Sequence, residues 1–192
     1  HLESALELTG DMVKHFWDEG NGGFYLVPDD GESLLVRKKE VYDGAIPSGN
    51  SVAMLNMLRL GRMTANPDFE EKAARIGRAF SGSVRQSPAA HAQLMVALDF
   101  AIGPSYEAVI AGNPHAADTK AMVEALRTRF LPNKVTLFNP GDGESTHIAE
   151  LAEFTRNQSS IGGRATAYVC LNHNCRLPTT DMDKMLELLD GA

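Results

Sequence analysis

The first hundred residues alternate between two kinds of hydrophobic pattern, both at helical spacing. Residues 2–17 place their apolar side chains on one side, and residues 67–80 do the same after an Asn66-Pro67 start, so both segments predict amphipathic outer helices. Residues 51–60 and 88–100 are apolar nearly all round, which is typical of a helix that is buried on most sides. The pattern therefore predicts helices in the order outer, inner, outer, inner.

Two shorter segments between the first and second helices have a different pattern. Residues 23–27 and 33–37 are rich in apolar and aromatic side chains, and they flank the turn-forming residues 28–31. They predict either a short β-hairpin or two extended arms around a turn.

The hydrophobic period changes from helical to strand-like after residue 104. Apolar runs at residues 108–111, 134–138 and 165–170 are each followed by a helical pattern. Three successive strand–helix units are typical of a small parallel sheet with helices packed against it. We therefore expect an α+β chain, with helical hairpins in residues 1–104 and a three-stranded parallel βαβαβα subdomain in residues 105–192.

Charge and composition narrow the classes of partner and compartment. The net charge is -7 and no Lys/Arg block is longer than residues 37–39, which argues against nucleic acid or an anionic membrane as a partner. No apolar run could span a membrane, the first residues lack the regions of a signal peptide, and only two cysteines are present, so we expect a cytoplasmic protein. Because the sequence opens inside a helical pattern without Met, we expect a piece of a longer protein.

The polar residues that precede the first inner helix form the main candidate site. Asp43 and Glu40 have side chains suited to acid/base catalysis or to accepting sugar hydroxyls, Lys39 would supply a counter-charge, and Ser48 and Asn50 would contact the ligand. The start of a helix favours such a ligand because its backbone N–H groups are free. In the alternative reading, Ser48 caps the helix, Asp43 and Asn50 hold the loop, and Lys39 pairs with a carboxylate.

A second candidate lies at the end of the first helix, where Asp18 precedes residues 22–25. Asp18 and Tyr25 would place a carboxylate beside an aromatic face, a combination that suits a sugar ring. The alternative is a structural turn in which the glycines supply positive φ, while Trp17, Phe24 and Tyr25 fill the core.

The third candidate is the pair Cys170 and Cys175 after the last predicted strand. The two thiols fit a redox dithiol or a loop-closing pair, and together with His173 and either His147 or an aspartate they would form a zinc site. The spacing is not Cys-x-x-Cys and no second pair completes a tetrahedral set, so we predict no metal site. No cofactor is predicted either, since the loop at residues 140–144 lacks the Lys-Ser/Thr of a phosphate-binding loop.

Several of these segments, taken in order, resemble one protein family. They are residues 16–18, 22–25, 39, 43–45, 47–51, 97–99, 103–104, 109–112 and 170–175. Together they are similar to the C-terminal part of the thioredoxin-domain-containing family that includes spermatogenesis-associated protein 20 and bacterial YyaL-type proteins. The resemblance extends over nearly the whole chain.

The resemblance implies a parent protein with an N-terminal thioredoxin-like domain and an (α/α)6 toroid like that of N-acylglucosamine 2-epimerases. This chain would carry the last hairpins of the toroid and a C-terminal appendage. A sugar-like small molecule is then the expected ligand. We expect the chain alone to be inactive and the parent to be epimerase-like or glycosidase-like, although residues 38–50 contain none of the histidines that epimerases of that fold use for proton transfer.

Two other functions fit the same sequence. One is thiol exchange between Cys170, Cys175 and the thioredoxin-like domain of the parent, and the other is a non-catalytic interaction module. Because two hairpins cannot close a six-hairpin ring, the inner helices should also expose apolar surface. The chain should therefore self-associate or pack its own strand–helix part over that surface. The missing N-terminal part of the parent is a further expected partner.

Overall fold

The chain forms two compact units. The computed structural model describes residues 1–32, 35–140 and 146–190, with the side chain of residue 146 left out. Unit 1 comprises His1–Gly61 and Asn66–Ala101, and unit 2 comprises Arg62–Ala65 and Ile102–Ala192. Of the sequence features above, most of the loop at residues 140–144 lies outside the described residues.

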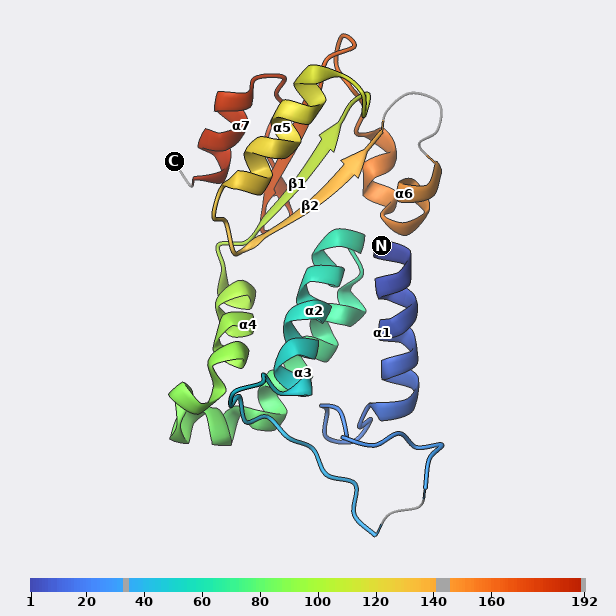
Figure 1. Cartoon of the computed structure of the whole chain (residues 1–192), viewed down its shortest axis with the longest axis vertical. Coiled ribbons are helices and arrows are strands. Elements are labelled where there is room, and N and C mark those ends of the chain that lie inside the picture. Colours follow the sequence, from blue (N-terminus) through green and yellow to red (C-terminus); the bar gives the residue numbers. More distant parts are fainter. Residues whose placement is uncertain (33–34, 141–145, 191–192) are drawn as a thin grey trace. The chain divides into compact units, whose positions relative to one another are not determined.

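Unit 1 is helical, and its helices are drawn in Figure 1. They are α1 (Leu2–Phe16), α2 (Gly49–Thr64), α3 (Pro67–Gln86), the 3-10 turn η1 (Pro88–His91) and α4 (Ala92–Ile102), with the last residues of α2 and α4 belonging to unit 2. Asn66 caps α3 by accepting a hydrogen bond from the backbone of Asp68 at 3.0 Å, and Pro67 is the first residue of the helix.

Burial distinguishes the helices much as their hydrophobic patterns predicted. Nine residues of α2 are buried but only three of the longer α3, which confirms the inner character of the first and the outer character of the second. Residues 88–100 differ from their prediction as one inner helix. They begin with the turn η1, and α4 buries only Leu94, Ala97 and Phe100 and exposes Met95 and Val96. Apolar side chains are therefore exposed on α4, while the incomplete ring and self-association stay predictions.

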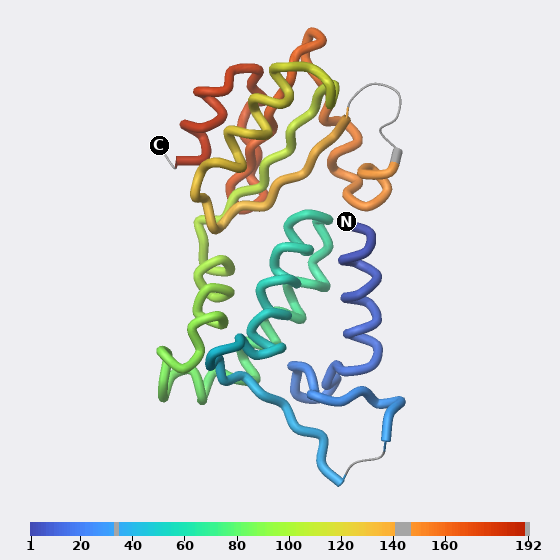
Figure 2. Tube along the Cα trace, viewed as in Figure 1, coloured from blue at the N-terminus to red at the C-terminus, as the bar shows by residue number. Residues whose placement is uncertain are grey.

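The segment between α1 and α2 is a long loop, which Figure 2 traces below the helices. Its described residues form two isolated antiparallel bridges, Trp17 with Phe24 and Tyr25 with Lys39, and no regular strand. Residues 33–34 lie outside the described part of the chain. Of the two alternatives, the described residues fit extended arms joined at Tyr25 and Lys39, and not a β-hairpin.

Unit 2 contains a mixed four-stranded sheet in the order β2-β1-β3-β4. The strands are β1 (Tyr106–Ala111), β2 (Lys134–Asn139), β3 (Thr166–Leu171) and β4 (Asn174–Cys175). Strands β1 and β2 are parallel, as predicted, but β3 runs antiparallel to β1 and the short β4 was not foreseen. The prediction of three parallel strands is wrong, because a run of apolar residues that is buried on both faces does not indicate whether the strand is parallel or antiparallel to its neighbour.

Helices α5 (Ala117–Thr128) and α7 (Met182–Leu189) pack on one face of this sheet (Figure 1). Tyr106, Ala108 and Ile110 of β1 point into that layer, where they meet Met122 of α5 and Met185 of α7. All six residues of β1 are buried. Glu107 and Val109, which alternate with them, therefore face the opposite side of the sheet.

A short helix and a 3-10 turn follow β2. They are α6 (Thr146–Leu151) and η2 (Glu153–Asn157), and Asn139 at the end of β2 holds η2 by donating to the carbonyls of Thr155 at 3.1 Å and Gln158 at 2.8 Å. Within the described parts of both units, none of the helices combines the length and the apolar character needed to cross a membrane.

Candidate functional site

The buried carboxylate of Asp18 is the centre of a polar cluster in unit 1. Its Oδ2 lies 2.7 Å from Nζ of Lys39 and accepts a hydrogen bond from the hydroxyl of Tyr25 at 3.0 Å. Its Oδ1 accepts the backbone N–H groups of Gly20 and Asn21 at 2.9 and 3.0 Å. The cluster therefore unites Asp18 and Tyr25 with Lys39, which the sequence had assigned to two separate candidate sites.

These contacts fix the ionisation states in the cluster. The ammonium of Lys39 is the main cause that holds the pKa of Asp18 well below its usual range, and the backbone and Tyr25 donors act in the same direction. The hydrogen bond to Asp18 in turn raises the pKa of Tyr25. Asp18 is thus a permanent carboxylate at neutral pH, which suits an anchor or a hydroxyl acceptor better than a group that exchanges protons.

The aromatic face of Tyr25 is also engaged. The guanidinium of Arg37 lies 4.2 Å from the centre of its ring, and Nζ of Lys39 lies 5.4 Å away. A sugar that stacks on Tyr25 would have to compete with these two cations for the ring.

Asn50 connects this cluster to the start of α2. Its Oδ1 accepts the N–H of Phe24 at 2.6 Å, and its Nδ2 donates to the carbonyls of Phe24 at 2.9 Å and Glu40 at 2.8 Å. Asn50 is 2% exposed. The amide of Asn50 therefore pairs with the backbone at Phe24 and at Glu40, much as the backbone of a neighbouring strand would. The alternative in which Asn50 holds the loop is confirmed.

The remaining members of the main candidate site have structural partners of the same kind. Oγ of Ser48 accepts the N–H of Ser51 at 3.1 Å, which is the predicted cap of α2. The two carboxylate oxygens of Asp43 accept the N–H groups of Ser48 at 2.8 Å and Leu94 at 3.0 Å, so Asp43 joins the loop to α4. Glu40 is exposed. The proposed catalytic and ligand-binding roles of these residues stay predictions.

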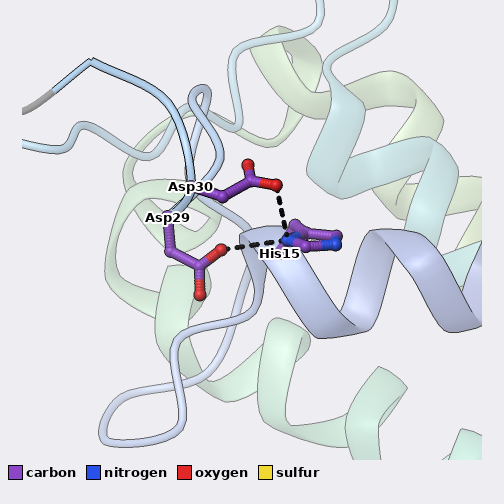
Figure 3. A group of neighbouring side chains, drawn as sticks. All are labelled: His15, Asp29 and Asp30. Atoms are coloured by element: carbon purple, nitrogen blue, oxygen red, sulfur yellow. Dashed lines mark hydrogen bonds and ion pairs between the residues drawn. The ribbon is translucent and has the colours of Figure 1, made fainter.

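The sequence analysis missed a cluster at the C-terminal end of α1, shown in Figure 3. Nδ1 of His15 lies 3.1 Å from Oδ1 of Asp29 and 3.4 Å from Oδ2 of Asp30. The hydrogen bond to His15 is the main cause that lowers the pKa of Asp29. These residue types can bind a divalent metal ion, but both carboxylates are more than half exposed and the contacts are those of an ion-pair cluster.

Cys170 and Cys175 form a disulfide bond in unit 2. The bond joins β3 to β4 across a two-residue turn, in which Asn172 and His173 both have positive φ. The two cysteines are therefore paired across the turn, an arrangement that fits both the loop-closing and the redox alternatives. Because the sulfurs are bonded to each other, they offer no thiolates to a metal ion in this state.

A cavity of about 210 Å³ opens beside the disulfide. Its lining comes from Arg62, Ala65, Glu107, Phe154, Cys170, His173 and Cys175. Glu107 is 4% exposed, and its carboxylate accepts hydrogen bonds from Nη1 of Arg62 and the backbone N–H of His173, both at 3.1 Å. The cavity therefore brings a disulfide, a buried ion pair and an imidazole together, a combination that the distant positions of these residues in the sequence did not indicate.

The chain was compared with known proteins. No family model matches it. It is 35% identical to spermatogenesis-associated protein 20 of Rattus norvegicus, 36% identical to that of Homo sapiens and 34% identical to that of Mus musculus, in each case over 98% of the chain. The chain spans only 24% of the length of these relatives. As the resemblance in the motifs around Asp18, Asn50 and Cys170 had indicated, the chain belongs to the spermatogenesis-associated protein 20 family and corresponds to about a quarter of its full-length members.

Proposed function

We propose that the chain takes part in thiol–disulfide exchange through Cys170 and Cys175. The observation that carries this proposal is the bond between the two sulfurs beside a cavity, with Cys175 exposed and Cys170 buried. By contrast, the described side chains of Asp18, Asp43, Ser48 and Asn50 are engaged in contacts that hold the loop before α2.

Because Cys175 is exposed and Cys170 is buried, Sγ of Cys175 is the sulfur that an incoming thiolate attacks. A thiolate of a reduced protein dithiol attacks Sγ of Cys175, the disulfide breaks, and Cys170 leaves as a thiolate that takes up a proton. The second thiol of the donor then attacks the donor's own sulfur in the mixed disulfide and releases Cys175, which is also protonated. The donor ends as a disulfide and the pair as two thiols.

The cavity supplies groups that affect the leaving thiolate. The guanidinium of Arg62 would stabilise a nearby thiolate by its charge and the imidazole of His173 by donating a hydrogen bond, whereas the carboxylate of Glu107 would oppose one. The ion pair between Arg62 and Glu107 offsets that repulsion. The thioredoxin-like domain that the resemblance implies for the longer protein is the proposed donor.

The test is a redox titration of the whole chain in thioredoxin-type and glutathione buffers, with alkylation of free thiols read by mass spectrometry. We expect reversible reduction between about -180 and -270 mV, the range of exchange proteins. Cys175→Ser is the matched control, because it leaves Cys170 with no partner to exchange. A pair that stays oxidised below about -300 mV would be purely structural and would refute the proposal.

A second candidate is a sugar-like ligand at residues 39–50, which would give the parent protein a role in carbohydrate metabolism. Its specific support is that Glu40 and Tyr42 are exposed beside the start of α2, with the ring of Tyr42 lying against Gly44. An exposed carboxylate and an aromatic ring are groups that commonly contact sugars.

The test of the second candidate is a screen of saccharides and sugar phosphates against the full-length protein. Glu40→Gln and Tyr42→Ala are the informative variants, because Asp43→Ala would also release the loop from α4. Binding that both variants abolish would support this candidate. Absence of sugar binding, or binding that neither variant alters, would remove it.

A further inference from the structure

The register of the sheet in unit 2 directs three residues of β2 toward helix α5. Lys134, Thr136 and Phe138 are aligned with Tyr106, Ala108 and Ile110 of β1, whose side chains point into the layer of α5 and α7. In a parallel pair, aligned residues share a face of the sheet. Lys134, Thr136 and Phe138 therefore lie on the same face as α5, whereas the disulfide is on the face of Glu107.

The outer side of α5 leaves part of this face uncovered, because β2 is an edge strand. A cavity of about 290 Å³ remains there, and we call it the α5–β2 cavity. Its helical wall comes from Val123, Leu126 and Arg127, which are spaced as one stripe of a helix, and its other wall from Lys134, Thr136, Leu137 and Phe138. The cavity is thus apolar over most of its lining and carries two cationic side chains and one hydroxyl.

The two cations have no carboxylate partner among the described residues. Within that part of the chain, no ion pair involves Arg127 or Lys134, and the only hydrogen bond that Nζ of Lys134 donates is to the carbonyl of Arg129 at 3.5 Å. Partial burial lowers the pKa of Lys134, since its ammonium has lost water without gaining a counter-charge. This is notable in a chain with a net charge of -7, where carboxylates are plentiful.

We propose that the α5–β2 cavity binds a small amphipathic monocarboxylate. The carboxylate would lie between Arg127 and Lys134, where a guanidinium offers paired donors and the ammonium a point charge, and Thr136 would donate its hydroxyl. The apolar body of the ligand would cover Phe138 and Val123. At roughly 30 Å³ for each heavy atom, as for water, the volume suits about ten such atoms, the size of octanoate.

The test measures binding of octanoate, octanol and octylammonium to the whole chain by calorimetry. These probes share an apolar body and differ in the charge of the head group. We expect octanoate to bind at least about tenfold more tightly than octanol, because hydrogen bonds to charged groups are the stronger ones. Octylammonium should bind weakest, because Arg127 and Lys134 repel its charge. Equal binding of octanoate and octanol would refute the anion site, and no binding of octanoate would refute the cavity as a ligand site.

Variants locate the site. Lys134→Met and Arg127→Met should each weaken octanoate binding about tenfold and leave octanol binding unchanged. Lys120→Met is the matched control, because Lys120 is an exposed cation on the same helix that does not line the cavity. Weakening by Lys120→Met to the same extent would show a general charge effect and overturn the proposal.

A measurement on the unmodified chain covers the case in which a variant fails to fold. Octanoate at saturation should slow acylation of Lys134 at least fivefold and leave acylation of Lys120 unchanged. Equal rates at Lys134 with and without octanoate would contradict the proposal.

Discussion

The ion pair between Asp18 and Lys39 should stabilise unit 1 far more than an ordinary surface pair. The two side chains are only 8% and 18% exposed, and Oδ2 lies 2.7 Å from Nζ. Lys39→Met removes the charged donor and leaves the carboxylate with the backbone N–H groups of Gly20 and Asn21 and the hydroxyl of Tyr25. The substitution also removes the hydrogen bond from Nζ to the carbonyl of Gly22 at 2.8 Å. We expect the free energy of unfolding to fall by about 2–4 kcal/mol, the cost of losing one hydrogen bond between charged groups and one to a backbone carbonyl in a largely buried site.

A double-mutant cycle isolates the pair. Asp18→Asn, Lys39→Met and the double variant should give a coupling free energy of about 2 kcal/mol in urea unfolding at pH 7. Trp17 is the only tryptophan of the chain and its ring lies 5.0 Å from that of Phe24, so its fluorescence reports on this part of unit 1. The exposed pair Lys184 and Glu187, at 2.8 Å, is the control, and its coupling should be below about 0.5 kcal/mol.

The pH dependence gives an independent check. The folded state holds the pKa of Asp18 below the value of about 4 that it has in the unfolded chain, so its contribution to stability is complete above that pH. It is lost as the pH falls through the folded-state pKa. The difference in stability between the wild type and Lys39→Met should therefore shrink below about pH 4. A coupling below about 0.5 kcal/mol at pH 7, or a difference that grows in acid, would refute this reasoning.

Three further substitutions test other parts of the fold. Asn50→Ala should destabilise unit 1 by about 3 kcal/mol in the same fluorescence assay, because it leaves three backbone groups, two of them on Phe24, without their partner. An unchanged urea midpoint would contradict the role of Asn50 in holding the loop. Gly112→Ala should lower the stability of unit 2, as measured by hydrogen exchange, by about 1–3 kcal/mol, since a Cβ there would lie 2.6 Å from Oγ1 of Thr119. An unchanged stability would mean that Thr119 moves freely. Cys175→Ser should lower the free energy of unfolding of unit 2 by about 2 kcal/mol, the entropic cost of closing a loop of about six residues. A loss above about 4 kcal/mol would show that the disulfide bond does more than close the hairpin.

The helices were largely predictable from the sequence because their signals are local. The cap at Asn66, the proline after it and the contrast between the all-round apolar α2 and the striped α3 all lie within one or two turns of chain. The direction of β3 was not predictable, because alternation of side chains carries no information on whether a neighbouring strand is parallel.

The candidate site was predictable in its residues but not in its connections. Asp18 and Lys39 were both selected from the sequence, yet they are 21 positions apart and meet only because the loop between α1 and α2 returns to the end of α1. The cluster of His15 with Asp29 and Asp30 gave no signal of its own, since a histidine in a helix and acidic residues in a turn are common separately. Such contacts depend on the path of a loop, and the hydrophobic pattern does not determine that path.

The central position of β1 has a consequence for the order in which the chain is made. Glu107 of β1 is hydrogen-bonded to His173, 66 positions later, and the edge of β1 that faces β3 cannot be paired until that part of the chain exists. At about 5–20 residues per second, synthesis leaves this edge and its carboxylate uncovered for roughly 3–13 seconds. During that interval the nascent chain offers an unpaired strand to other chains. Unit 2 should therefore depend on early chaperone contact more than the helical unit, whose helices satisfy their backbone groups within a few residues of chain.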